Sequence, residues 1–331
     1  MMRSVLMTKV GAPDVLELCE IEKPEMSSPS DLLIRIHAAG INPIDTKLRQ
    51  GLYPMDNLPA VLGCDGSGIV EEVGSAVNRF QTGDEVYFFH GGIGTIQGNY
   101  AEFRTIDERF VAHKPESLSF IEAAAAPLVL ITAWEALYDR AHIKADQNVL
   151  IHAGAGGVGH VAIQLAKIAG ANVCTTISSD EEADFVRSLG ADMTINYKEQ
   201  NFVEAVLDWT DGNGVDIVMD NVGSKLIEAS FPAIAHYGHF VTLLQPDKET
   251  DWIVARQRNI GIHLEIMLSP LLFGLKDAQK HQTFILEECA RYFDAGKLTI
   301  HISQSMPLAE AARAHVEIES GTTTGKIVLT M

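Results

Sequence analysis

The sequence predicts an α/β protein in which a barrel-like β module precedes a doubly wound parallel sheet. Residues up to about 117 hold short strand-like runs broken by Gly, Pro, Asn and Asp, a spacing typical of all-β modules. From residue 148 onward, strand-like and helix-like segments alternate, which is the pattern of a parallel sheet with crossover helices. A glycine-rich turn follows directly on the first of these strands.

The N-terminal part contains three apolar runs that are predicted strands. They span residues 32–37, 68–73 and 84–89. The run from Gly63 to Gly68 is predicted to be a close-packed bend, because no strand–helix unit surrounds it. Ser119 and Glu122 form a capping-box pattern that opens an alanine-rich helix. Pro127 should interrupt this helix, so a second helical stretch is expected around residues 132–137.

The second half of the chain carries the alternating pattern. Its predicted strands are residues 148–152, 172–177, 193–197, 215–219 and 239–244, and residues 184–189 are a predicted helix. An amphipathic helix is expected after Gly159, with Val161, Ala162, Leu165 and Ala169 on one face. After about residue 266 the chain turns helical again, and residues 326–330 form a terminal strand that we expect to return to the first domain.

Composition excludes several classes of protein. The chain has 331 residues, 47% of them apolar, so it can bury a large core divided between two domains. A net charge of −19 argues against binding nucleic acid or an anionic membrane surface. The first residues lack the apolar core of a signal peptide, so we expect a cytoplasmic protein. The four cysteines are scattered without a Cys-x-x-Cys pair, as expected of reduced thiols.

The glycine-rich turn predicts a dinucleotide site. Gly154 should permit a tight turn, Gly156 should let the backbone approach a pyrophosphate, and Gly159 should let the following helix pack closely on the strand. The N-terminus of that helix offers N–H groups and a positive dipole end to phosphates. The candidate phosphate-binding residues are Gly154, Ala155, Gly156, Gly157, Val158 and Gly159.

Several motifs in a fixed order carry a family resemblance over essentially the whole chain. They are residues 40–46, 51–54, 63–68, 83–86, 153–159, 190–192, 195–197, 220–223 and 324–329, together with Gly74. On these motifs the chain resembles the zinc-independent quinone oxidoreductase (zeta-crystallin-like) branch of the medium-chain dehydrogenase/reductase superfamily. The resemblance implies a GroES-like β-barrel catalytic domain (residues 1–125 and 267–331) and a Rossmann domain (residues 126–266), with the active site between them. It also implies a homodimer.

The residues at the family's zinc positions differ from those of the zinc-dependent relatives. Those relatives carry Cys, His and Cys where this chain has Asn42, Cys64 and a position near Leu128. Catalytic zinc needs three N or S ligands, and one thiol does not hold the ion, so we expect no metal.

Without zinc, the resemblance implies hydride transfer from NADPH to a small-molecule quinone or activated alkene (an enone or enal). A conjugated carbonyl already makes the accepting carbon electrophilic, and a hydrogen-bond donor can stabilise the developing oxyanion. The alternatives are a zinc-type alcohol dehydrogenase and a non-catalytic nucleotide-binding structural or interaction protein.

The substrate-site candidates come from the resemblance and from their chemistry. Asn42 and Tyr53 are expected to donate hydrogen bonds to a substrate carbonyl, and Lys47 and Thr132 are expected to line the substrate cleft. For Asn42, Lys47 and Thr132 an ordinary structural role stays open: a turn at Asn42-Pro, a solvated surface lysine and a hydroxyl at a helix start. Asp45 is expected to cap a short helix.

The identity of the dinucleotide is left open by the second strand of the sheet. Small residues after it, Ser178 and Ser179, leave room for a 2′-phosphate, and Tyr197 matches a family residue that packs beside that group. NADP(H) is therefore favoured, with NAD(H) as the alternative. The family's basic partners, however, fall at Glu182 and Gly321, and Arg187 or Lys198 would have to compensate. The nicotinamide end is expected near Asn221, Val222 and Gly223.

Overall fold

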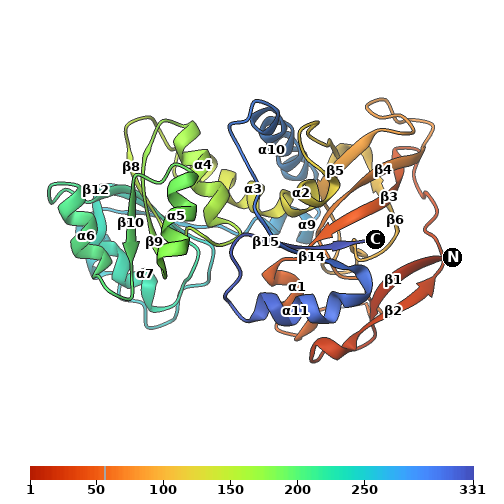
Figure 1. Cartoon of the computed structure of the whole chain (residues 1–331), viewed down its shortest axis with the longest axis horizontal. Coiled ribbons are helices and arrows are strands. Elements are labelled where there is room, and N and C mark those ends of the chain that lie inside the picture. Colours follow the sequence, from red (N-terminus) through yellow and green to blue (C-terminus); the bar gives the residue numbers. More distant parts are fainter. Residues whose placement is uncertain (56) are drawn as a thin grey trace. The chain divides into compact units, whose positions relative to one another are not determined.

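The computed structural model describes residues 1–55 and 57–331 and divides them into two compact units (Figure 1). One unit comprises Met1–Leu128 together with Leu268–Met331, and the other comprises Val129–Met267. The predicted α/β fold class is confirmed, while the domain boundaries expected from the sequence stay a prediction. Among the described residues, no helix is long and apolar enough to cross a membrane. All four cysteines are free thiols.

The first unit is built on a branched, seven-stranded sheet and a separate hairpin of β1 and β2. Strand β3 pairs antiparallel with β4 from Leu32 to Ala38, with β6 from Asp31 to Arg35 and with β15 at its last residues. The three predicted strands are confirmed as β3, β4 and β5. The strands of this unit are β1 (Met2–Met7), β2 (Leu16–Ile21), β3 (Asp31–Gly40), β4 (Asp65–Val73), β5 (Glu85–Phe89), β6 (Phe103–Asp107), β7 (Ala112–His113), β14 (Ile302–Pro307) and β15 (Lys326–Thr330).

The glycines in the first part of β4 are required by close packing. A Cβ on Gly68 would lie 2.1 Å from the Arg35 carbonyl oxygen, and one on Gly66 would lie 2.7 Å from the Phe88 ring. Contacts that short are sterically forbidden, so larger residues would push β4 away from its neighbours. The predicted close packing of Gly63–Gly68 is confirmed, but the predicted bend is wrong for residues 65–68, which are paired as the first part of β4.

The helices of the first unit begin and end largely where local signals place them. The Ser119–Glu122 capping box starts α2, which ends before Pro127, where α3 (Pro127–Trp134) begins. The capping box and the helix break are therefore confirmed. The helices are α1 (Pro43–Arg49), α2 (Phe120–Ala125), α9 (Ser269–Leu272), α10 (Lys276–Asp294), α11 (Ala311–Glu319) and the 3-10 turns η1 (Pro13–Val15), η2 (Glu108–Phe110) and η5 (Leu308–Glu310).

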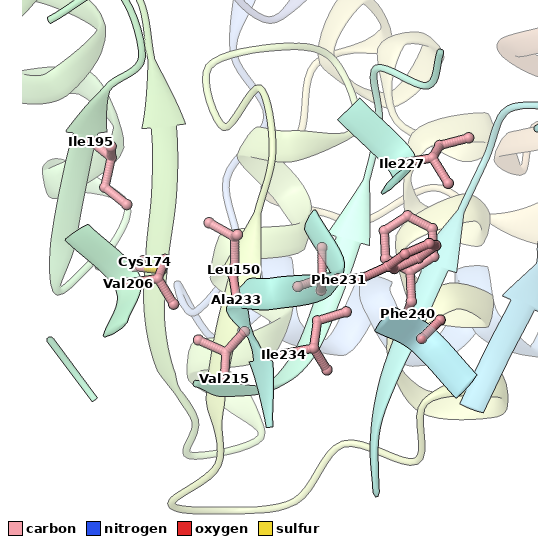
Figure 2. Packing of buried hydrophobic residues seen from close by; sticks show 12 residues of the cluster. Leu150, Cys174, Ile195, Val206, Val215, Ile227, Phe231, Ala233, Ile234 and Phe240 are labelled. Carbon is pink, nitrogen blue, oxygen red and sulfur yellow. The ribbon is translucent and has the colours of Figure 1, made fainter. Parts of the chain in front are cut away.

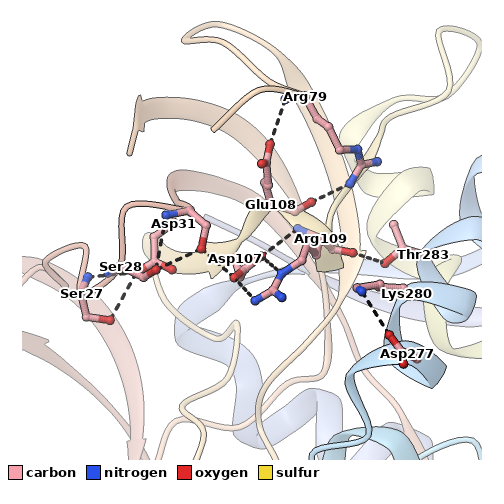
Figure 3. Close-up of polar contacts among 11 residues, drawn as sticks. Ser27, Ser28, Asp31, Arg79, Asp107, Glu108, Arg109, Asp277, Lys280 and Thr283 are labelled. Atoms are coloured by element: carbon pink, nitrogen blue, oxygen red, sulfur yellow. Dashed lines mark hydrogen bonds and ion pairs between the residues drawn. The ribbon is translucent and has the colours of Figure 1, made fainter. Parts of the chain in front are cut away.

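Side-chain bonds fasten the C-terminal segment to the N-terminal strands. Thr283 Oγ1 of α10 donates to the carbonyl of Arg109 at 3.0 Å (Figure 3), and Tyr87 OH donates to the carbonyl of Leu286 at 2.5 Å. On the same side of the unit, the Asp107 carboxylate pairs with Arg109, and Figure 3 shows both residues beside the attachment point. The bonds of Thr283 and Tyr87 join parts of the chain that lie more than 170 positions apart in sequence.

The second unit is a Rossmann domain whose six strands are all parallel, in the order β10-β9-β8-β11-β12-β13. This order is that of a doubly wound dinucleotide-binding sheet. All five predicted strands are confirmed. Its elements are η3 (Glu135–Arg140), β8 (Asn148–Ile151), α4 (Gly159–Ile168), β9 (Asn172–Ile177), α5 (Asp180–Ser188), β10 (Met193–Asn196), α6 (Phe202–Trp209), β11 (Val215–Asp220), α7 (Lys225–Ser230), η4 (Phe231–Ala233), β12 (Ile234–Thr242), α8 (Ile253–Gln257) and β13 (Gly261–Leu264).

Three expectations about the elements need correction. The helix after Gly159 is buried on all sides over Gly159–Ala166, so α4 is not amphipathic there. Strand β13 was not predicted. The segment after residue 266 is not purely helical, since β14 interrupts it, and the polar residues of that strand hide its strand pattern.

Aromatic packing closes the core of the Rossmann unit on one side of its sheet. Phe231 and Phe240 are fully buried, and their rings meet edge to face with centroids 5.3 Å apart (Figure 2). Leu150 and Val215 belong to the same cluster. Edge-to-face pairs add stability beyond the buried apolar area.

Replacing Phe240 by alanine should therefore lower the free energy of unfolding by about 3–5 kcal/mol, because a large cavity would open in this core. Urea unfolding followed by far-UV circular dichroism measures the loss. Phe273→Ala, at a side chain that is 74% exposed, is the control and should change stability by less than about 0.5 kcal/mol. Equal effects of the two substitutions would contradict the packing described above.

Candidate functional site

The glycine-rich turn joins β8 to α4 at the carboxyl edge of the parallel sheet. Gly154 N–H donates to the Thr176 carbonyl at 3.2 Å, and Ala153 N–H donates to Thr176 Oγ1 at 3.0 Å. These bonds fix the turn against the end of β9. Gly154 was expected to permit the tight turn. The residue of the turn with a left-handed backbone is instead Ala153, with φ of 55°. Gly154 is needed for packing instead, because a Cβ there would lie 2.1 Å from Thr175 Oγ1.

The three glycines of the motif differ in what surrounds them. A Cβ on Gly159 would lie 2.2 Å from the Ala153 carbonyl oxygen, so this glycine lets α4 approach the turn, as expected. Among the described residues, a Cβ on Gly156 would meet nothing within 4 Å except that same oxygen, at 3.3 Å. The backbone at Gly156 is thus open to a ligand, while the other two glycines are enclosed by protein.

The start of α4 is suited to an anion. Its N-cap residue, Val158, makes no side-chain cap, and the first turn contains no acid. Helix N–H groups left uncapped favour a phosphate at this end of the dipole. The residues that would hold a pyrophosphate are therefore those of the predicted set from Gly154 to Gly159.

The next two strand ends lie beside this turn. Ser178 and Ser179 follow β9, and Tyr197 follows β10, where its N–H donates to the Ile177 carbonyl at 3.1 Å. The Tyr197 side chain is 56% exposed. Ser179 caps α5, because its hydroxyl accepts the N–H of Glu182 at 3.3 Å. The structure thus brings these three predicted residues to one edge of the sheet, next to the glycine turn.

The residues after β11 form a tight turn around a buried carboxylate. Asp220 Oδ1 accepts the N–H groups of Val222 and Gly223, each at 3.0 Å. Asn221 Nδ2 donates to the His152 carbonyl at 2.8 Å, and its buried Oδ1 has no partner within residues 1–55 and 57–331. An unpaired buried acceptor is costly, and a ribose hydroxyl would satisfy it.

His152, at the end of β8, has a structural role. Its two ring nitrogens lie 3.3 Å from Thr176 Oγ1 and 3.0 Å from Ser230 Oγ. Burial lowers its pKa to about 4, although Asp220 opposes the shift. A neutral imidazole with both ring nitrogens bonded is therefore expected at neutral pH. It helps to hold the ends of β8 and β9 together.

Asn42 lies at the start of α1 in the first unit and is fully buried. Its Nδ2 donates to Asp65 Oδ2 at 2.8 Å, and its Oδ1 accepts a short hydrogen bond from Lys326 Nζ. The same ammonium donates to the Ile41 carbonyl at 2.9 Å. The carboxamide is thus held in one orientation by a cation and a carboxyl group, with a single N–H left over.

Two acids complete this network. Asp45 accepts the Asn42 N–H at 2.9 Å, which confirms it as the helix cap, and it also accepts Tyr100 OH at 3.1 Å. Burial raises the pKa of Asp45 to about 6 and that of Asp65 to about 7, with Lys326 opposing the shift at Asp65. Burial also lowers the pKa of Lys326. We call Asn42, Asp45, Asp65 and Lys326 the buried polar network.

The positions expected for zinc ligands converge on this network. Leu128 N–H donates to Asp65 Oδ1 at 2.9 Å, and the Cys64 thiol lies 3.7 Å from Asp45 Oδ1. Burial raises the pKa of Cys64 well above its usual range, and the nearby Asp45 and Asp65 carboxyls raise it further. Within the described part of the chain, no group of three or more His, Cys, Asp or Glu side chains is arranged to hold a metal ion.

The remaining substrate candidates are less enclosed. Tyr53 lies in the turn after α1 and is 44% exposed, and Lys47 is half-buried on that helix. Thr132 belongs to α3 and is buried. The structure ties Asn42 to Asp65 and Lys326 and not to Tyr53. Sequence reasoning missed Asp65 and Lys326, although a lysine within an apolar terminal strand is a signal of a buried cation.

Two family profiles match the chain. The profile described as "Alcohol dehydrogenase GroES-like domain" matches residues 28–116, and the one described as "Zinc-binding dehydrogenase" matches residues 189–329.

Relatives of known name match over the full length. A quinone oxidoreductase of Pseudomonas aeruginosa is 34% identical over 99% of both chains, and quinone oxidoreductase 1 of Escherichia coli is 32% identical over 97% of both. Among solved structures, an alcohol dehydrogenase superfamily protein from Novosphingobium aromaticivorans superposes with a TM-score of 0.93 at 33% identity, covering 100% of both chains. Escherichia coli quinone oxidoreductase complexed with NADPH superposes with a TM-score of 0.88 at 30% identity, over 99% of this chain and 100% of that one. The chain therefore belongs to the zinc-independent quinone oxidoreductase branch of the medium-chain dehydrogenase/reductase superfamily.

Proposed function

We propose that this chain transfers a hydride from NADPH to a quinone or an activated alkene, such as an enone or enal, without a metal ion. The observation that carries the proposal is the buried polar network, which places the ammonium of Lys326 among the positions where zinc-dependent relatives have ligands. Reducing a conjugated carbonyl needs a hydride donor and a hydrogen bond to the oxygen, but no metal to stabilise an alkoxide. The relatives named quinone oxidoreductase support the same reaction.

The nucleotide supplies the hydride, and the protein binds and orients it. The residues from Gly154 to Gly159 would hold the pyrophosphate, since the backbone at Gly156 is open and the N-cap residue of α4, Val158, makes no side-chain cap. Asn221 would accept a ribose hydroxyl through Oδ1, next to Val222 and Gly223. A solved relative complexed with NADPH supports this choice of cofactor.

Tyr53 is the better candidate for direct contact with the substrate oxygen. Its hydroxyl belongs to a side chain that is 44% exposed, whereas Asn42 is fully buried and its backbone N–H, backbone carbonyl, Nδ2 and Oδ1 are all bonded. We assign Tyr53 as the donor that stabilises the developing oxyanion, and Asn42 as a neighbour whose last N–H can add a second bond. In the first unit, Lys47 would line the substrate site, and in the second unit, Thr132 would lie beside the nicotinamide.

A homodimer formed through the Rossmann unit is the assembly we propose. Strand β13 lies at the edge of the sheet, so one of its sides has no neighbouring strand among the described residues. Leu264 and Ile266, at the end of this strand, are 57% and 50% exposed. Exposed apolar edges are ready to pair with a second copy. Four free thiols suit a reducing compartment, and we propose the cytoplasm.

The reaction is tested by following NADPH absorbance with a panel of quinones, enones and aldehydes. We expect NADPH to be oxidised with quinones or enones, at a rate that chelators such as 1,10-phenanthroline do not change. Stoichiometric bound zinc and chelator-sensitive alcohol oxidation would contradict the proposal. Nucleotide binding without turnover of any acceptor would instead support a non-catalytic protein.

Tyr53→Phe should lower kcat/KM for the quinone about tenfold, the effect of losing one hydrogen bond of about 1.4 kcal/mol in the transition state. Affinity for NADPH should stay within twofold. Tyr237→Phe, at a side chain that is 75% exposed in the Rossmann unit, is the control and should leave both quantities unchanged. Asn42→Ala is a poorer test, because it also removes one hydrogen-bond partner from each of two buried residues, Asp65 and Lys326. A Tyr53→Phe enzyme with unaltered kcat/KM would remove this residue from the mechanism.

Sedimentation equilibrium should give about twice the chain mass of 36.0 kDa. Leu264→Lys should shift the protein toward monomers, because it places a charge beside the edge strand. The control is Leu18→Lys on β2, where the side chain is 44% exposed, and it should leave the mass unchanged. A wild-type protein that sediments as a monomer at micromolar concentration would refute the dimer.

A further inference from the structure

Two residues of opposite charge, Glu182 and Lys198, bind the backbone of Ser178 just after β9. The family resemblance implies a lysine and an arginine at the positions where this chain has Glu182 and Gly321. A 2′-phosphate bound without a cation would forgo its charge-assisted hydrogen bonds. A cation from elsewhere is therefore needed if NADPH is to be preferred over NADH.

Lys198 reaches this place from the neighbouring strand. Strands β9 and β10 run parallel with Ile177 opposite Asn196, so the residues after both strands lie side by side. Lys198 Nζ donates to the Ser178 carbonyl at 3.0 Å, and its backbone N–H donates to Asn196 Oδ1 at 3.2 Å. The side chain is exposed. Its ammonium is thus held at the residue that follows β9, directly beside the candidate ribose site.

Arg187, the other basic residue near this edge, is bonded elsewhere. Its guanidinium pairs with Asp184 at 3.2 Å and donates to Thr194 Oγ1 at 2.8 Å. Lys198, in contrast, takes part in none of the ion pairs found among the described residues. Its charge is therefore available to a ligand.

Glu182 binds the other backbone group of the same serine. Its Oε2 accepts the Ser178 N–H at 2.6 Å, while Lys198 binds the Ser178 carbonyl. The two charges are not in contact with each other, since they form no ion pair within 4 Å. In NAD enzymes, an acid at the end of the second strand accepts the ribose 2′-hydroxyl. Glu182 is suited to that role, and its charge opposes a phosphate there.

We propose that Lys198 binds the 2′-phosphate of NADPH and that Glu182 accepts the 2′-hydroxyl of NADH. The two side chains, one on each side of Ser178, determine how strongly the protein prefers one nucleotide over the other. This assignment rests on the proposed function, because it concerns the same nucleotide site.

Dissociation constants of NADPH and NADH, measured by fluorescence titration without substrate, test the assignment. Lys198→Ala should weaken NADPH binding roughly tenfold and change NADH binding less than twofold. Arg187→Ala removes the same charge from the same edge of the sheet and should change neither. In the wild type, raising the salt concentration should weaken NADPH binding more than in Lys198→Ala, because salt screens an exposed ion pair.

The acid is tested separately. Glu182→Gln should tighten NADPH binding severalfold and weaken NADH binding, whereas Asp184→Asn, on the same helix, should change neither. NADPH affinity within twofold of wild type in Lys198→Ala, or an equal loss in Arg187→Ala, would overturn the assignment while leaving the proposed function intact. A wild-type protein that binds neither nucleotide would overturn both.

Discussion

The first unit depends on one buried ammonium. Lys326 begins the last strand, and it bonds Asn42 and the Ile41 carbonyl at the start of the first helix, 284 and 285 positions away in the sequence. Burying a charge is costly unless it is paired and hydrogen-bonded, and Asp65 and Asp45 supply the compensating carboxyls. The residues around the candidate substrate donors are therefore ordered by the same interaction that fastens the C-terminal strand to the sheet.

In the Rossmann unit, the candidate binding groups lie at the edge of a sheet. Its strands are parallel, so their carboxyl ends meet at one edge of the sheet. The glycine turn, Ser178, Tyr197 and Asn221 all follow strands that end there. Core packing around Phe231 and Phe240 keeps these strand ends in register. A rigid sheet thus positions a set of loops that would have no fixed geometry alone.

The sequence predicts well what depends on neighbouring residues. The capping box at Ser119, the helix break at Pro127 and the strand before Gly154 all follow from local rules, and all are confirmed. The buried polar network could not be derived in this way, because Lys326 and Asn42 meet only after the whole first unit has folded. The short strand β13 and the polar strand β14 were missed, since neither carries a clear apolar alternation.

The candidate site shows the same division. The candidate nucleotide residues follow a compact motif and the ends of predictable strands, so the sequence places them at one edge of the sheet. Which cation stands near Ser178 could not be named in advance, because Arg187 and Lys198 are equivalent in the sequence and differ only in what they contact. The turn also holds a detail that the motif hides: Ala153, and not a glycine, adopts the left-handed conformation.

The unequal surroundings of the three motif glycines have a consequence for how such a chain can change over generations. Gly154 and Gly159 are constrained by protein atoms about 2 Å from any added Cβ, so selection for folding alone would retain them. Gly156 is free of that constraint and is kept only by what approaches it from outside. In a descendant that had lost its nucleotide, Gly156 would drift first, while the pattern around it would still look intact.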